Sequence, residues 1–178
     1  FEFILTTNIL LIFHFPMQIE TYLYGIGVKY NRVKWTKPNG AWSKLSEDSG
    51  WFSRIIIHND TIYGIGSEQA IWSASVIGGS WTQITTPKNV TDLAYWNGRL
   101  YAVGIDNGLY WTEPNNGSWS ELAVGGWVSR IVIQDDTIYG IGEDQAIWST
   151  SVHGGSWAKI TTGSVIDLAY WSGPESRR

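Results

Sequence analysis

The chain lacks several features that would place it in a common class. None of its 178 residues is cysteine, so neither a disulfide framework nor a thiolate metal site is available. No stretch shows a helical period, and the apolar run at residues 9–15 is too short to cross a membrane. A net charge of −4 argues against a general surface for nucleic acid or anionic lipid. The length suits one domain with its own core.

What the chain contains is an internal repeat. Residues 51–96 and 127–171 are two copies of one segment, and most of their aligned positions are identical. Residues 51 and 127 are 76 residues apart, and two looser copies are offset by half that distance. They contain the related segments that begin at Leu23 and Leu100. The matching tyrosines, spaced 39, 38 and 38 residues apart, are Tyr24, Tyr63, Tyr101 and Tyr139. A fixed period of this length indicates a repeat architecture.

Each repeat contains four short segments with strand character. A β-branched run is followed by a two-residue turn such as Asn97-Gly98, which is a strong hairpin signal. A glycine-containing second strand, a third strand and a short fourth strand that begins with tryptophan come next. The first strands are expected at 52–58, 90–96, 128–134 and 165–171, with residues 9–15 as the first strand of the first repeat. The sequence therefore predicts an all-β chain, a β-propeller of four-stranded antiparallel blades.

The repeat also predicts where the blades begin and end. We expect propeller repeats over residues 9–173, with blades at 9–50, 51–88, 89–126 and 127–163 and an incomplete fifth from 164. Residues 1–8 are an ill-defined stretch and 174–178 a tail. About four repeats of 38 residues with leftovers predict an incomplete or open ring, part of a larger propeller. An incomplete ring would also allow the chain to associate with itself.

Tryptophan is the unusual component of the repeat. The chain has 12, which is three per repeat. A buried aromatic ring hides about 150–250 Å² from water, so most of these side chains are expected to pack blades together. The set that follows the tyrosine-containing segments is Trp35, Trp72, Trp111 and Trp148.

One position of the first strand alternates in charge from repeat to repeat. It holds Arg54, Asp92, Arg130 and Asp167. In a ring of blades these side chains would stand side by side around the inner rim. We expect a belt of ion pairs between blades, and the alternative is a channel for a charged ligand.

Three short motifs resemble those of a known family. Gly125-Gly126-Trp127, Ile138-Tyr139-Gly140-Ile141 and Asp144 ahead of Ile147-Trp148, with their earlier copies, resemble the tachylectin-2 and tectonin class of lectin propellers. The resemblance covers residues 22–171. It implies self/non-self recognition of simple or modified sugars, including N-acetylated ones, on glycan surfaces, without catalysis or a cofactor. The Gly-Gly-Trp pattern departs from the family, since alternate repeats have Asn89 and Ser164 in place of the tryptophan.

The residues themselves suit a sugar between neighbouring blades. The loop that joins two blades and the turn after the second strand emerge on one face, so an indole should lie beside carboxylate and amide oxygens. Such sites are weak singly, about millimolar, and repetition would raise avidity by roughly 10². The alternative is that Trp51 and Trp127 are wedges that pack between blades. The predicted sugar-binding residues are Trp51, Glu68, Gln69, Asp106, Asn107, Gly126, Trp127, Asp144 and Gln145.

The main alternative is a protein-interaction propeller with no sugar site, in which the polar turns vary while the core persists. An enzyme is not indicated. His14, His58 and His153 occupy non-equivalent positions, and the sialidase-like Ser-Val-x-Gly-Gly-Ser-Trp turns lack the aspartate of that motif. No recurrent metal-ligand spacing is present. Secreted and cytoplasmic locations both fit the composition.

Overall fold

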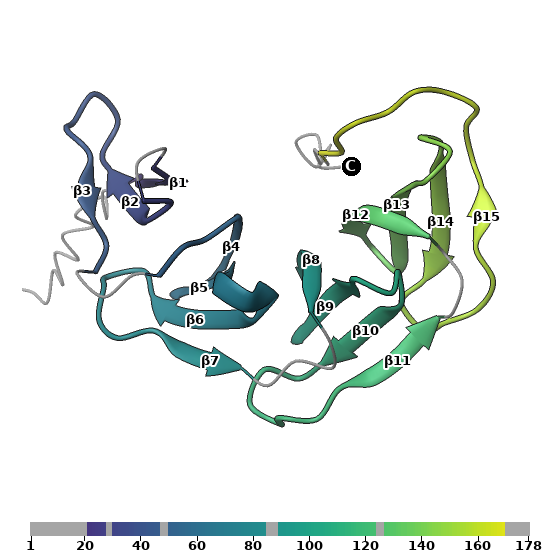
Figure 1. The fold of residues 1–178 in the computed structure, drawn as a ribbon, viewed down its shortest axis with the longest axis horizontal. Coiled ribbons are helices and arrows are strands. Elements are labelled where there is room, and N and C mark those ends of the chain that lie inside the picture. Colours follow the sequence, from purple (N-terminus) through teal and green to yellow (C-terminus); the bar gives the residue numbers. More distant parts are fainter. Residues whose placement is uncertain (1–20, 28–29, 47–49, 85–88, 124–126, 170–178) are drawn as a thin grey trace, which may run out of the picture.

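A computed structural model describes residues 21–27, 30–46, 50–84, 89–123 and 127–169. In this part the chain forms four antiparallel sheets, which stand side by side in an open arc (Figure 1). We number them blades 1 to 4 in chain order. The all-β repeat architecture and the open ring are thereby confirmed.

The strands follow the predicted segments closely. Blade 1 contains β1 (Leu23–Ile26), β2 (Val33–Thr36) and β3 (Ser43–Lys44). Blade 2 contains β4 (Arg54–His58), β5 (Thr61–Ile65), β6 (Ile71–Ser75) and β7 (Thr82–Ile84), with a 3₁₀ turn at Ser67–Gln69. Blade 3 contains β8 (Val90–Trp96), β9 (Arg99–Gly104), β10 (Leu109–Thr112) and β11 (Ser120–Ala123). Blade 4 contains β12 (Val128–Gln134), β13 (Thr137–Gly142), β14 (Ile147–Ser151) and β15 (Ala158–Lys159).

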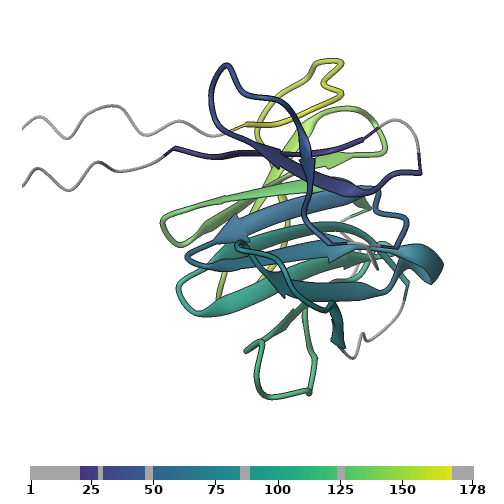
Figure 2. The same cartoon turned by 90° about the vertical axis from the view of Figure 1, so that its left-hand side faces the viewer.

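Within each sheet the strands are ordered as in the chain, from the inside of the arc to the outside (Figure 1). The first turns are the predicted ones: Asn59, Asn97 and Asp135 have φ of +50°, +46° and +50°. Asparagine and aspartate tolerate this left-handed conformation better than other side chains. Because the strands are antiparallel, the turns lie at two edges of the stacked sheets (Figure 2). We call the edge with the Asn97-Gly98 turn the hairpin face, and the edge with Gly50-Trp51 the linker face.

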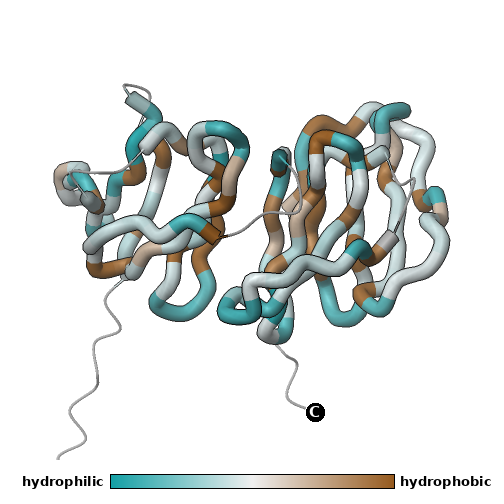
Figure 3. The backbone as a smooth tube through the Cα atoms, turned by 60° about the horizontal axis from the view of Figure 1, so that its bottom comes forward, coloured by the Kyte–Doolittle hydropathy of each residue, from teal (hydrophilic) through white to brown (hydrophobic). Residues whose placement is uncertain are grey.

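Three apolar clusters lie between neighbouring blades and form the core. Figure 3 shows apolar residues concentrated on the strands and polar ones at the turns. Each cluster joins a third-strand residue of one blade (in β2, β6 or β10) to a second-strand residue of the next (in β5, β9 or β13). All six side chains are at most 1% exposed. Burial of each such side chain contributes about 1.5–3 kcal/mol. The three sets are Val33 with Ile62, Ile71 with Leu100, and Leu109 with Ile138.

The tryptophans of the third strands recur once per repeat, but they do not occupy equivalent places in the sheets. Trp35 and Trp111 lie opposite the repeat tyrosine, whereas Trp72 and Trp148 lie opposite the glycine that follows it in blades 2 and 4. A shift of one residue in a strand moves the side chain to the other face of the sheet. Trp35 and Trp111 therefore pack toward the following blade, and Trp72 packs toward the preceding one. In this respect the structural unit is a pair of blades.

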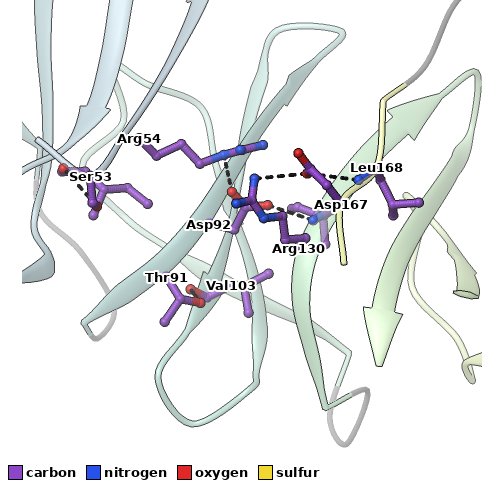
Figure 4. Close-up of polar contacts among 10 residues, drawn as sticks. Ser53, Arg54, Thr91, Asp92, Val103, Arg130, Asp167 and Leu168 are labelled. Atoms are coloured by element: carbon purple, nitrogen blue, oxygen red, sulfur yellow. Dashed lines mark hydrogen bonds and ion pairs between the residues drawn. The ribbon is translucent and has the colours of Figure 1, made fainter. Parts of the chain in front are cut away.

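The predicted belt of ion pairs is present along the inner strands (Figure 4). Arg54 Nε pairs with Asp92 Oδ1, and Arg130 Nη1 lies 3.1 Å from Asp167 Oδ1. Asp92 also accepts a hydrogen bond of 2.7 Å from the backbone amide of Ile131. One carboxylate thus links blade 2, blade 3 and blade 4.

The two ends of the arc differ from the expected four-stranded pattern. Blade 1 has three strands in the described part, and its predicted first strand at 9–15 lies outside that part. Over residues 164–169, the described part of the predicted first strand of a fifth blade is not a strand and pairs with no other described strand. Asp167 nevertheless pairs with Arg130 as Asp92 pairs with Arg54, so this segment lies where the next blade would begin.

Candidate functional site

The two tryptophans of the predicted sugar site lie on the linker face and are accessible. Trp51 is 63% exposed and Trp127 is 56% exposed, unlike the partly buried tryptophans of the fourth strands in blades 2 to 4. Trp127 has a φ of +45°, which is unusual for an aromatic residue. Gly126 lies outside the described residues. The exposed rings are compatible with a ligand platform, and the site stays a prediction.

The aspartates of that site make hydrogen bonds within their own blades. Asp106 accepts from the Tyr110 hydroxyl at 2.8 Å and from the Gly108 amide at 3.2 Å. Asp144 accepts from Lys159 Nζ at 2.6 Å, from Trp148 Nε1 at 3.0 Å and from the Ala146 amide at 3.1 Å.

These bonds affect the acidity of Asp144. The hydrogen bond from Lys159, followed by that from Trp148, lowers the pKa of Asp144 to about 2. The carboxylate is exposed, yet both of its oxygens already have donors. Its evident role is to hold the turn between β13 and β14, and a sugar would have to share these oxygens.

The amide-bearing residues of the predicted site occupy strained turn positions. Gln69, Asn107 and Gln145 have φ of +55°, +60° and +59° at the same place in three blades. In blade 2 the preceding Glu68 also has a positive φ, of +62°. Its side chain makes no hydrogen bond within the described part of the chain, in contrast to Asp106 and Asp144.

A small cavity of about 280 Å³ lies on the linker face of blade 2. Gly50 and Ser67 both line it, which confirms that the linker and the turn after the second strand meet there. Trp81 also lines it, and the buried indole N–H of Trp81 has no hydrogen-bond partner among the described residues. None of the predicted sugar-binding residues lines this cavity.

A larger pocket, of about 780 Å³, lies on the opposite, hairpin face. We call it the hairpin-face pocket. It is built by turns and strand ends of blades 2, 3 and 4, and its lining residues are Thr61, Tyr63, Tyr95, Trp96, Asn97, Gly98, Arg99, Glu113, Pro114, Asn115, Asn116 and His153. Sequence reasoning missed it. A signal was available, because blade 3 has Tyr95-Trp96 where blade 2 has Ile57-His58.

Aromatic stacking gives this pocket a firm wall. The Tyr95 ring stacks on His58 with ring centroids 3.8 Å apart and on Tyr63 at 5.8 Å. Tyr63 is 7% exposed, and burial, followed by the nearby Tyr95, raises the pKa of its hydroxyl. The Tyr63 hydroxyl is therefore neutral at physiological pH, and the wall offers the ring faces of Tyr63 and Tyr95.

A positioned cation stands beside that wall. The Arg99 guanidinium lies 4.0 Å from the centroid of the Trp111 ring, a distance typical of cation–π contacts. Asn97 and the loop residues Asn115 and Asn116 add amide groups that can both donate and accept hydrogen bonds. The arrangement combines apolar ring faces, the Arg99 guanidinium, the Glu113 carboxylate and several amides in an open pocket.

Among the described residues there is no group of three or more His, Asp or Glu side chains that could hold a metal ion. Within the same residues, no helix is long and apolar enough to cross a membrane.

Comparisons with known proteins identify the fold. No family model and no curated protein matches the sequence. Solved structures do match. They include YCF48 bound to D1 peptide (TM-score 0.59, 16% identity, 79% of this chain and 51% of that chain) and YCF48 from Cyanidioschyzon merolae (0.60, 13%, 78% and 53%). A third is a complex of S. cerevisiae Dbp5 bound to Nup159 and Gle1 (0.57, 13%, 79% and 40%).

These neighbours are β-propellers, and at such low identity the likeness shows the fold alone. This chain has the β-propeller fold. It spans about half the length of the YCF48 chains that it matches. The comparisons add nothing specific to tachylectin or tectonin.

Proposed function

We propose that this chain is a non-catalytic, protein-binding propeller that takes an extended segment of a partner protein in the hairpin-face pocket. The observation that carries the proposal is the pocket itself, which three blades build from aromatic rings, amides and one fixed guanidinium. Its volume of about 780 Å³ falls in the range of roughly 300–1,000 Å³ that is usual for ligand sites.

The lining residues suit a peptide in its backbone and in its side chains. The amides of Asn97, Asn115 and Asn116 can bond to both the N–H and C=O groups of an extended strand. The Tyr95 and Trp96 rings offer apolar area at low cost in conformational entropy. Arg99 can bind a carboxylate in two parallel hydrogen bonds, so we expect a segment that pairs an apolar or aromatic residue with Asp or Glu.

Two of the similar propellers were solved with bound protein. YCF48 was solved bound to D1 peptide, and Dbp5 was solved bound to Nup159. These bound partners are properties of those proteins. They support protein binding as the proposed function of this chain.

Selection from a displayed library of random 12-residue peptides tests the proposal. The enriched peptides should contain an acidic residue and should bind wild type in fluorescence anisotropy. Arg99→Ala should weaken binding by about 10- to 100-fold, because hydrogen bonds to a charged group contribute about 1.5–3 kcal/mol. Trp127→Ala, on the linker face, is the matched control and should leave binding unchanged. Peptides that ignore Arg99→Ala and are lost with Trp127→Ala would refute the assignment of the pocket.

Sugar binding on the linker face is the second candidate, and the exposure of Trp51 and Trp127 is the observation that favours it. A sugar would place its C–H groups on these rings and its hydroxyls against Gln69 and Gln145. Tryptophan fluorescence during titration with N-acetylglucosamine measures this directly. The response should disappear in the Trp51→Ala, Trp127→Ala double variant. An identical response in wild type and in the folded double variant removes the candidate.

A further inference from the structure

The two ends of the arc are the two halves of an interface that the chain already uses three times. Between blades, a third-strand residue such as Ile71 packs against a second-strand residue such as Leu100, and both are buried. At the blade 4 end the corresponding third-strand residue is Ile147, which is only half-buried. At the blade 1 end the corresponding second-strand residue is Leu23, which is 49% exposed.

The fourth strands show the same pattern of unmatched ends. Ile84 of blade 2 and Trp119 of blade 3 belong to one cluster. Their counterparts at the ends are Ile160 on blade 4, which is 51% exposed, and Trp42 on blade 1, which is 53% exposed. Each end therefore displays one half of the apolar surface that buries its equivalents inside the arc.

One end also carries a segment beyond blade 4, and at the other end β1 is an edge strand among the described residues. Residues 165–169 lie in the position of the inner strand of a next blade. Asp167 pairs with Arg130, Val165 and Leu168 are half-buried, and Ile166 between them is 84% exposed. Blade 1 has the second, third and fourth strands of a blade, and among the described residues β1 pairs only with β2. Residues 165–169 and β1 border the opening of the arc on opposite sides (Figure 1).

We propose that two copies of this chain close into a ring, in which residues 165–169 of each copy form an inner strand beside β1 in the other copy's blade 1. The three internal interfaces argue for a second copy as the occupant, because it brings both the matching apolar surface and a matching strand edge. The pairing of β8 with β9 sets the register: Asp92 opposite Val103 and Leu93 opposite Ala102. Asp167 then lies opposite Ile26 of the partner subunit, and Leu168 opposite Gly25 of the partner subunit.

The inner charges fit this closure. Inside the arc, the acid Asp92 has Arg54 on one side and the strand that carries Arg130 on the other. Asp167 has Arg130 on one side, and the described residues place no blade on its other side. In the closed ring the strand that follows would be β4 of the partner, so the alternation of sign would continue without two like charges side by side.

The mass of the 178-residue chain in solution, measured by light scattering after gel filtration, tests the proposal. Wild type should have twice the 20.0 kDa mass of one chain. Trp42→Glu and Ile160→Glu each place a charge at one end, on a side chain that is more than half exposed, so each variant should fold and be monomeric. Ile105→Glu is the matched control, because Ile105 is 58% exposed and lies between β9 and β10 of blade 3, away from both ends; it should remain a dimer.

An equimolar mixture of Trp42→Glu and Ile160→Glu separates this arrangement from other dimers. The Trp42→Glu chain keeps an intact blade 4 end, and the Ile160→Glu chain keeps an intact blade 1 end. One interface can therefore form between them, and the dimer mass should return. Circular dichroism of each variant verifies that it is folded. A monomeric wild type, which would mean that other residues fill blade 1, overturns the proposal. So does a mixture that stays monomeric, or a mass of three or more chains.

Discussion

Two ion pairs at the same repeat position show how surroundings change the energy of one interaction. Arg54–Asp92 lies inside the arc and Arg130–Asp167 lies at its end. The Asp92 side chain is 1% exposed and that of Asp167 is 66% exposed. The chemistry of the pair is the same, so the difference in contribution to stability comes from burial by the next blade.

Burial also has a cost for the inner pair. Loss of water raises the pKa of Asp92 above its usual range, although Arg54 and the Ile131 amide act in the opposite direction. An acid whose pKa is raised in the folded state contributes most to stability at pH values below 3.8, its pKa in the unfolded chain. This contribution to stability falls as the pH rises. Asp92 therefore connects three blades, and the loss of water around its carboxylate opposes the favourable contacts with its partners.

Removal of Asp92 gives the largest expected effect. Asp92→Ala should lower the free energy of unfolding by about 3 kcal/mol, because Arg54 and the Ile131 amide lose their partner in a buried place. Asp167→Ala is the matched control, and it should cost at most about 1 kcal/mol, as exposed pairs do. Urea unfolding at low protein concentration measures both. Equal losses would mean that burial does not separate the two pairs.

The same contrast between interior and end can be made with tryptophan. Trp119 packs in the cluster between blades 2 and 3, whereas Trp42 occupies the same strand position at the open end. Trp119→Ala should cost about 2 kcal/mol, less than the 3–5 kcal/mol of a fully buried ring. Trp42→Ala should cost less than about 1 kcal/mol in the monomer. Thermal unfolding of dilute samples ranks them, and a larger loss for Trp42→Ala would reverse the comparison.

Much of the fold follows from the sequence because the repeat states it several times. The strand segments, the turns at Asn59, Asn97 and Asp135, and the alternating charges were all predictable from period and turn chemistry. The third-strand tryptophans were not. Their distance from the repeat tyrosine is 11, 9, 10 and 9 residues, and such small changes hardly alter the period, whereas a shift of one residue in register reverses the face of the sheet.

The candidate site was harder to predict for a related reason. The hairpin-face pocket depends on residues that break the repeat, such as Tyr95, Trp96 and Arg99, brought together from turns of different blades. Reasoning from the repeat favours positions that recur. It found the exposed Trp51 and Trp127, and it passed over a pocket in which one blade differs from its neighbours.

The turn acids extend the comparison to a smaller effect. Asp106 and Asp144 each accept a hydrogen bond from the amide two residues later, and Glu68 at the same position does not. Glu68→Asp should restore this bond and raise the free energy of unfolding by about 0.5–1 kcal/mol. The shorter acid also tolerates a positive φ better. Chemical denaturation tests this, with Glu68→Ala as the variant that should gain nothing. A neutral or harmful Glu68→Asp would show that the blade 2 turn has a different geometry for another reason.

The smallest expected effect is the pH dependence of the stability that Asp144 contributes, which differs in sign from that of Asp92. The pKa of Asp144 is lowered from 3.8 to about 2, chiefly by the hydrogen bond from Lys159, so its contribution is complete above 3.8 and is lost as pH falls through about 2. The contribution of Asp92 runs the other way and is common to wild type and to Asp144→Asn. The difference in thermal midpoint between these two proteins therefore isolates Asp144, and it should shrink as the pH is lowered across this window. A constant difference would mean that Asp144 acts through hydrogen bonds that the amide of Asn preserves, rather than through the charge on its carboxylate.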